Sequence, residues 1–155
     1  MMAPVSGSGV HKHPRSDGSV TSRATRHADG SVDLEQSGTS SWSPPAGTLE
    51  RLYWDEVRRT TLGLVRFSRN SIRVAGIWPV LIRFGPMVDG GRPIVGGLFA
   101  RRPQGHIHWS ADGGRVVVAV DRFAPLMRGP FWRVESWFHG LVGRRFLDRA
   151  ARGED

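Results

Sequence analysis

The chain has 155 residues, a formal net charge of +8 and no Cys. This length fits one domain, and the lack of Cys excludes disulfide partners, Cys-ligated zinc, iron–sulfur clusters and thiol nucleophiles. Because Met1–Pro14 lacks an apolar core followed by a cleavage site, we expect no secretory signal and a cytoplasmic location. The most apolar region, Val74–Phe84, is interrupted by Gly, Pro and Arg and is shorter than the roughly 20 apolar residues that span a bilayer.

The first 48 residues differ in composition from the rest of the chain. They are dense in Ser, Gly, Thr, Asp and Pro and contain few large apolar side chains. Such a segment buries too little apolar surface to offset the entropy lost on ordering. Prolines and a glycine in Trp42-Ser-Pro-Pro-Ala-Gly47 then mark a boundary. We therefore predict a disordered leader over residues 1–48 and a single folded domain over residues 49–155.

A first helix is predicted over Leu49–Thr60. Apolar and aromatic side chains recur there at helical spacing, among them Leu52, Tyr53 and Val57. The hydroxyl of Thr48 is placed to cap the first turn. Gly63 disfavours an extension beyond Thr60, so the helix is expected to end there.

Short alternating segments separated by turn residues follow this helix. Alternation with period two indicates strands that are buried on one face, and tight turns between them indicate antiparallel pairing. Turns are expected at Arg69-Asn70, at Val88-Asp-Gly-Gly91 and at Asp112-Gly-Gly114. We predict four to six strands within Leu62–Ser68, Ser71–Ala75, Trp78–Phe84, Pro93–Ala100, Gly105–Ser110 and Arg115–Phe123.

The last third of the chain ends in a long amphipathic helix from about Phe131 to Arg152. Its apolar face holds Phe131, Val134, Phe138, Leu141 and Val142, flanked by Glu135 and Phe146 and continued by Arg145 and Arg149. Gly140 and Gly143 fall on the opposite side and weaken the helix. The predicted fold class is α+β, an antiparallel sheet packed on this C-terminal helix, with space for a cavity between them.

Arg145 falls among the apolar residues of the C-terminal helix. A buried guanidinium needs a carboxylate or an anionic ligand, so Arg145 is a candidate for gripping an acidic group at the mouth of a cavity. The alternative is that the apolar face ends near Val142 and that Arg145 reaches water from the end of the helix. We favour this alternative.

Four residues form a candidate metal site. His106 and His108 share one face of a strand, whereas Glu135 and His139 are neighbours on the helix. Together they would suit a divalent transition metal. However, Ile107 and the following Trp109 are expected to point inward, which turns both strand histidines toward water. We therefore assign no metal and no cofactor.

Basic residues alternate with aromatic ones at several places, as in Arg66-Phe67, Arg83-Phe84 and Arg122-Phe123. This pattern and the net charge are compatible with binding to nucleic acid or to an anionic membrane. Alternation of outward Arg with inward Phe in a half-buried sheet explains the same pattern, so we rank these partners below a small ligand. No nucleophile turn of the Gly-x-Ser-x-Gly type and no phosphate-binding glycine loop occurs.

The order of elements from Trp78 to Arg152 resembles the START-like, helix-grip superfamily, which includes polyketide cyclases and lipid-transfer proteins. The resemblance is carried by the strand that ends Val116-Val-Val-Ala-Val-Asp-Arg-Phe123 and by the helix through Trp137-Phe-His-Gly-Leu-Val-Gly-Arg-Arg-Phe-Leu147. It implies a curved antiparallel sheet around a long C-terminal helix, with an apolar cavity between them. That superfamily shares no catalytic residues and usually opens with a strand before two short helices.

We thus expect a non-catalytic module that binds a small apolar, potentially acidic, ligand such as a lipid or polyketide. The expected ligand-binding residues are Phe131, Val134, Glu135, Phe138, His139, Leu141, Val142 and Arg145, with Arg145 or His139 as the polar contact. The alternatives are a basic surface for nucleic acid or anionic membrane, and an enzyme of the cyclase or hydrolase type. The enzyme would use His139 with Glu135 or Asp121.

Overall fold

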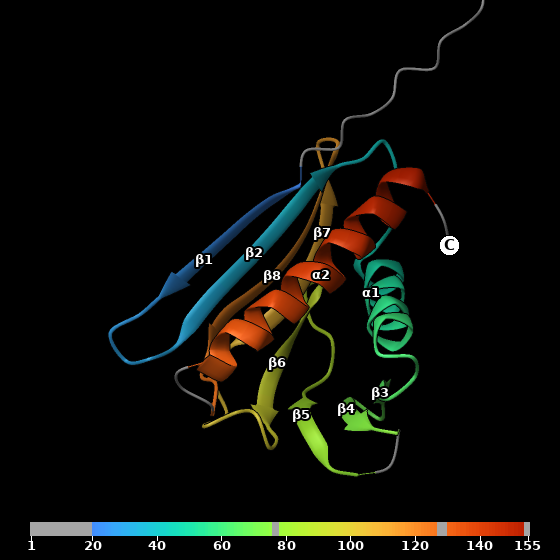
Figure 1. Cartoon of the computed structure of the whole chain (residues 1–155). Coiled ribbons are helices and arrows are strands. Elements are labelled where there is room, and N and C mark those ends of the chain that lie inside the picture. The colour runs from blue at the N-terminus through green and yellow to red at the C-terminus, as the bar shows by residue number, and fades with distance from the viewer. Residues whose placement is uncertain (1–19, 76–77, 127–129, 154–155) are drawn as a thin grey trace, which may run out of the picture.

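The computed structural model describes residues 20–75, 78–126 and 130–153, and for residues 130–136 it describes the backbone alone. One antiparallel sheet of eight strands carries both helices on the same face (Figure 1). The strand order is β1-β2-β8-β7-β6-β5-β4-β3, so the last strand lies beside the second. The predicted α+β class is confirmed.

The strands that precede the long helix agree with the segments predicted from alternation. The bounds are β1 (Thr21–Arg26), β2 (Val32–Thr39), α1 (Ala46–Thr60), β3 (Val65–Ser68), β4 (Ser71–Val74), β5 (Val80–Phe84), β6 (Gly91–Gly96), β7 (His106–Asp112), β8 (Arg115–Phe123) and α2 (Pro130–Arg152). Each of the six predicted segments overlaps a strand, although β6 begins two residues before the predicted Pro93 and β7 ends two residues after the predicted Ser110. Two further strands precede α1.

These two further strands, β1 and β2, correct the predicted leader. β2 pairs along its length with β8, and its first residue, Val32, is 1% exposed opposite Phe123. The β1–β2 turn is fixed by Asp29, whose carboxylate accepts hydrogen bonds from the backbone and the hydroxyl of Ser31. A polar segment orders here because a neighbouring strand satisfies its backbone, a contribution that composition does not reveal. Residues 1–19 of the predicted leader lie outside the described residues.

Helix α1 begins three residues before the predicted start. Pro45 is extended and its carbonyl accepts the N–H groups of Thr48 and Leu49, at 3.0 and 3.2 Å. Thr48 therefore lies inside the first turn, and no side chain caps the N-terminus of this helix. Leu49, Leu52, Tyr53 and Val57 are buried, as their spacing predicted.

Helix α2 lies close to β2 because small residues stand where the two elements meet. Gly38 of β2 lies beneath Leu147, and a side chain at Gly38 would reach within 3.4 Å of the Leu147 Cβ atom. Gly143 is buried, and a Cβ atom there would overlap the side-chain amide of Gln36. That amide donates to the carbonyl of Gly140 at 3.3 Å. Gly143 therefore faces the sheet, whereas the helical spacing had predicted that it lies on the side opposite the apolar face.

An ion pair joins the two helices. Arg149 of α2 is 7% exposed, and its Nη1 atom lies 3.0 Å from Asp55 Oδ2 and 3.5 Å from Glu56 Oε2 of α1. Arg145, one turn earlier, is exposed and donates to the Thr60 hydroxyl at 3.5 Å. The buried, paired arginine expected on the apolar face is thus Arg149, whereas Arg145 reaches water as the favoured alternative predicted.

Within the described part of the chain, neither helix combines the length and the apolar character that crossing a bilayer requires.

We predict that Arg149→Met lowers the free energy of unfolding by about 3 kcal/mol, because it leaves the buried Glu56 carboxylate without its cation. Arg145→Met, the matched substitution at the exposed site, should change it by less than about 0.5 kcal/mol. Urea unfolding of the two variants measures both values. Equal effects at the two sites would contradict the structural role of Arg149.

We further predict that Gly143→Ala depends on Gln36. In a Gln36→Ala background the substitution should stabilise α2 by about 1 kcal/mol, the difference in helix propensity between Ala and Gly. In the parent chain this gain should be cancelled, because the Gln36 amide must leave its place and lose a hydrogen bond worth ~1 kcal/mol. A double-mutant cycle by urea unfolding measures the coupling, and strict additivity would contradict the close approach of α2 to β2.

Candidate functional site

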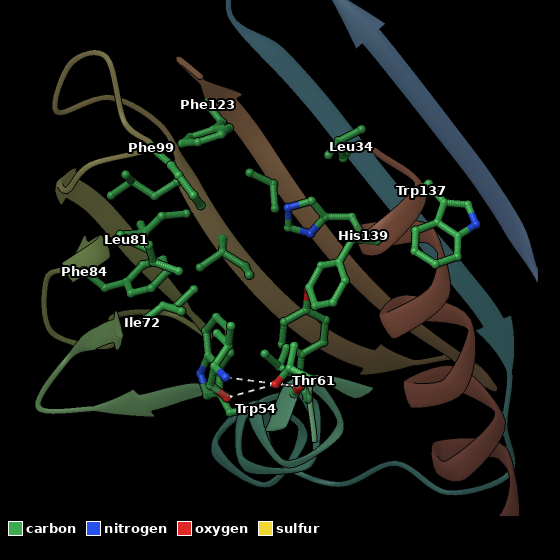
Figure 2. Close-up of a pocket in the computed structure, with 18 residues that line it drawn as sticks. Leu34, Trp54, Thr61, Ile72, Leu81, Phe84, Phe99, Phe123, Trp137 and His139 are labelled. Carbon is green, nitrogen blue, oxygen red and sulfur yellow. Dashed lines mark hydrogen bonds between the residues drawn. The ribbon is translucent and has the colours of Figure 1, made fainter. Parts of the chain in front are cut away.

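A cavity of about 410 Å³ lies between the sheet and the two helices (Figure 2). Its walls are almost entirely apolar or aromatic. The lining residues are Leu34, Tyr53, Trp54, Val57, Thr61, Val65, Ile72, Leu81, Ile82, Phe84, Ile94, Phe99, Ile107, Val120, Phe123, Trp137, Phe138 and His139. The cavity therefore draws on α1, α2 and strands β2 to β8.

The wall from α1 is built on a charged pair that lies behind the aromatic rings. Glu50 is buried, accepts a hydrogen bond from Trp54 Nε1 at 3.0 Å and pairs with Arg92 of β6. The Trp54 ring stacks on Phe67, with centroids 4.8 Å apart and planes 3° apart, and the Arg92 guanidinium lies 5.4 Å from the Phe67 centroid. The charges are thus satisfied outside the cavity, and of these four side chains only Trp54 lines it.

Thr61 brings a hydroxyl to the end of α1, but this group is already bonded. It donates to the Val57 carbonyl at 2.9 Å and accepts the backbone N–H of Val65 at 3.0 Å. These bonds join the end of α1 to the start of β3. Thr61 therefore shapes the cavity without offering a free polar group.

Two polar side chains face the cavity without a hydrogen-bond partner among the described residues. His139 projects from α2 toward the cavity (Figure 2), and Tyr53 of α1, which is 4% exposed, contributes its phenol ring. Burial lowers the pKa of His139 to about 4 and raises the pKa of the Tyr53 hydroxyl. Both groups are neutral near pH 7, so they offer uncharged hydrogen-bond donors and acceptors.

The structure divides the residues that we expected to bind a ligand. Phe138 and His139 line the cavity, whereas the half-buried Leu141 and the fully buried Val142 do not. Arg145 is exposed and is not part of the lining, so it does not stand at the cavity mouth as the functional hypothesis required. Three more predicted residues, Phe131, Val134 and Glu135, belong to the part of α2 whose side chains are not described.

Most of the lining was missed because it comes from α1 and from the sheet. The signal was present in the alternation of the strands, which places Ile107 of β7 and Val120 of β8 on the inner face. It did not separate residues that face a cavity from residues that fill the core, such as Trp109, which is 1% exposed. That distinction depends on where the helices lie.

The histidines of β7 point away from the cavity, as Ile107 and Trp109 predicted. His106 is exposed, and His108 Nδ1 lies 3.2 Å from Asp121 Oδ2. Asp121 is thus on the outer face of the sheet and is not a partner for His139. No group of three metal-ligating side chains occurs among the residues that the structure describes.

Acidic side chains pair with part of the basic surface. Asp55 pairs with two exposed arginines besides Arg149, and Asp29 lies within 4 Å of two others. The described arginines that pair with acids include Arg58, Arg59, Arg92, Arg102, Arg115, Arg122 and Arg149.

Comparison of the chain with family models, curated proteins and solved structures found no match. The cavity itself therefore carries the functional argument.

We predict that the free energy of unfolding decreases as the pH falls from 6.5 to about 4, because of His139. These two values are the ordinary pKa of His and the pKa of His139 in the folded protein. Over this range the unfolded chain binds a proton that the folded chain does not, so protonation favours unfolding. His139→Phe should reduce this loss of stability, measured as the free energy of unfolding in urea at several pH values. His106→Phe, on the outer face, is the control, and an unchanged pH slope in His139→Phe would contradict the burial of a neutral imidazole.

Proposed function

We propose that this protein binds a small apolar molecule in the cavity between its sheet and helices, and that it acts as a carrier or sensor and not as a catalyst. The observation that carries the proposal is a 410 Å³ space whose described lining has no charged side chain. Small-molecule sites typically occupy about 300–1,000 Å³ and combine apolar walls with a few polar groups. This cavity has that size and that composition.

The absence of charge in the lining also bears on the alternative of an enzyme. Asp121, one proposed partner of His139, is on the other face of the sheet, and Glu135 lies among the side chains that are not described. Neutral Tyr53 and His139 are suited to holding a polar group. We therefore place binding ahead of cyclase or hydrolase chemistry.

The arrangement of elements supports the expected likeness to the START-like superfamily. A curved sheet with a long C-terminal helix across it and an apolar cavity between them is what that likeness implies (Figure 1). Strands β1 and β2 also supply an extended segment before α1, which the predicted element order lacked. We propose this relationship, together with a cytoplasmic location, as the context for ligand binding.

The proposal predicts that filling the cavity weakens binding of an apolar fluorescent probe, N-phenylnaphthylamine. Val120 of β8 lines the cavity. Val120→Trp should weaken the binding of the probe by about tenfold or more, because the larger side chain occupies part of the cavity. The matched control is Val117→Trp, on the outer face of the same strand, which should bind the probe like the parent. Fluorescence titration measures both affinities.

Failure of the parent protein to bind the probe, or equal weakening by both substitutions, would overturn the proposed function. Native mass spectrometry of protein purified from its own host provides a second test. A small molecule that leaves on unfolding identifies the natural ligand class.

A further inference from the structure

We propose that the cavity binds a neutral apolar molecule that carries one hydroxyl group, and that Tyr53 and His139 hydrogen-bond this group at the end of the cavity beside β2. This inference rests on the proposed function, because it names the class of ligand for the same cavity. It is carried by the position of the polar groups and by the absence of charge around them.

The polar end of the cavity is marked by a second, smaller hollow of about 40 Å³. It shares four lining residues with the main cavity, namely Leu34, Tyr53, Val120 and His139. Its remaining lining residues are Ser22, Gln36, Val118 and Gly140. Polar side chains therefore gather where the two hollows share a wall, between β1, β2 and α2, while the rest of the main cavity is apolar.

The hydrogen bonds at this end leave two groups for a ligand. Gln36 already donates its amide to the Gly140 carbonyl. In contrast, the hydroxyl of Tyr53 and the imidazole of His139 contact no polar partner among the described residues, although Tyr53 is 4% exposed. Buried tyrosine hydroxyls and other buried polar groups are normally hydrogen-bonded, so a polar group of a bound molecule would complete this site.

The charge of the site favours a neutral ligand over the acidic ligand considered from the sequence. No described residue that lines either hollow is an Arg, Lys, Asp or Glu. A carboxylate at the polar end would lose its hydration without gaining a counter-ion, which is costly. Arg145, the residue expected to supply that counter-ion, is exposed and lines neither hollow.

A hydroxyl group matches this pair of side chains better than other neutral groups do. A neutral imidazole has one donor and one acceptor nitrogen, and a phenol both donates and accepts. An alcohol can donate to the imidazole nitrogen and accept from the phenol at the same time. A ketone or ether can only accept, so it would leave the acceptor nitrogen of the imidazole without a donor.

The test uses the full-length chain and displacement of N-phenylnaphthylamine by dodecanol, its methyl ether and dodecanoate near pH 7. Dodecanol should bind at least about tenfold more tightly than dodecanoate, because only the carboxylate must be buried as an ion. Tyr53→Phe and His139→Phe should each weaken the binding of dodecanol by about threefold to tenfold, which is the effect of losing one hydrogen bond. In His139→Phe the affinity for the methyl ether should fall less than the affinity for dodecanol, because an ether cannot donate a hydrogen bond to the imidazole nitrogen.

The results separate this inference from the proposed function. Equal or tighter binding of dodecanoate, or unchanged dodecanol affinity in both variants, would overturn the inference. The cavity proposal survives that result provided that the probe binds the parent and binds Val120→Trp more weakly. If the parent protein does not bind the probe, both the inference and the proposed function are refuted. Tyr53→Phe removes a single oxygen atom, and its circular dichroism spectrum verifies that the fold is retained.

Discussion

The pairing of Arg149 with Asp55 and Glu56 is the contact on which the shape of this molecule depends. It fixes the C-terminal half of α2 against α1, and its two acidic partners directly follow Tyr53 and Trp54, which line the cavity. The N-terminal half of α2 lies across the sheet away from α1 (Figure 1). The two helices are therefore joined at one end and separate at the other, and the cavity lies where they separate. A buried ion pair contributes little net stability, but it penalises any arrangement in which its members do not meet.

Side-chain size determines where α2 touches the sheet. Gly38 and Gly143 let β2 and α2 approach closely, and Leu147 packs directly over Gly38. Toward the other edge of the sheet, on the same face, large side chains such as Phe84 and Phe99 line the cavity from β5 and from the segment after β6. Since α2 rests on β2, it cannot also fill the volume above these strands. The cavity is thus a consequence of small residues at one contact and of a sheet wider than the helices that cover it.

The distribution of charge gives the cavity its chemical character. Glu50 and Arg92 neutralise each other behind Trp54 and Phe67, so the charged groups nearest to the aromatic wall do not face the interior. What remains at the cavity surface is hydrocarbon, with the neutral groups of Tyr53 and His139 at one end. Such a surface discriminates by the shape and hydrogen bonding of a ligand and not by its charge. This character leads to a ligand that is apolar along most of its length and polar at one point.

Local patterns in the sequence were sufficient for the class of fold, for both helices and for six of the strands, because helical spacing, alternation and turn residues act over a few neighbours. They also placed Phe138 on the inner side of the last helix. Only the tertiary structure decided that β1 and β2 join the sheet, since a polar strand is ordered by pairing with β8, far away in the chain. Similarly, periodicity placed both Arg145 and Arg149 on the apolar face, and only the position of the acids on α1 decided that Arg149 is buried. The cavity is likewise decided by the tertiary structure. It is the space left between packed elements, and its size depends on their relative positions and not on the pattern of neighbouring residues.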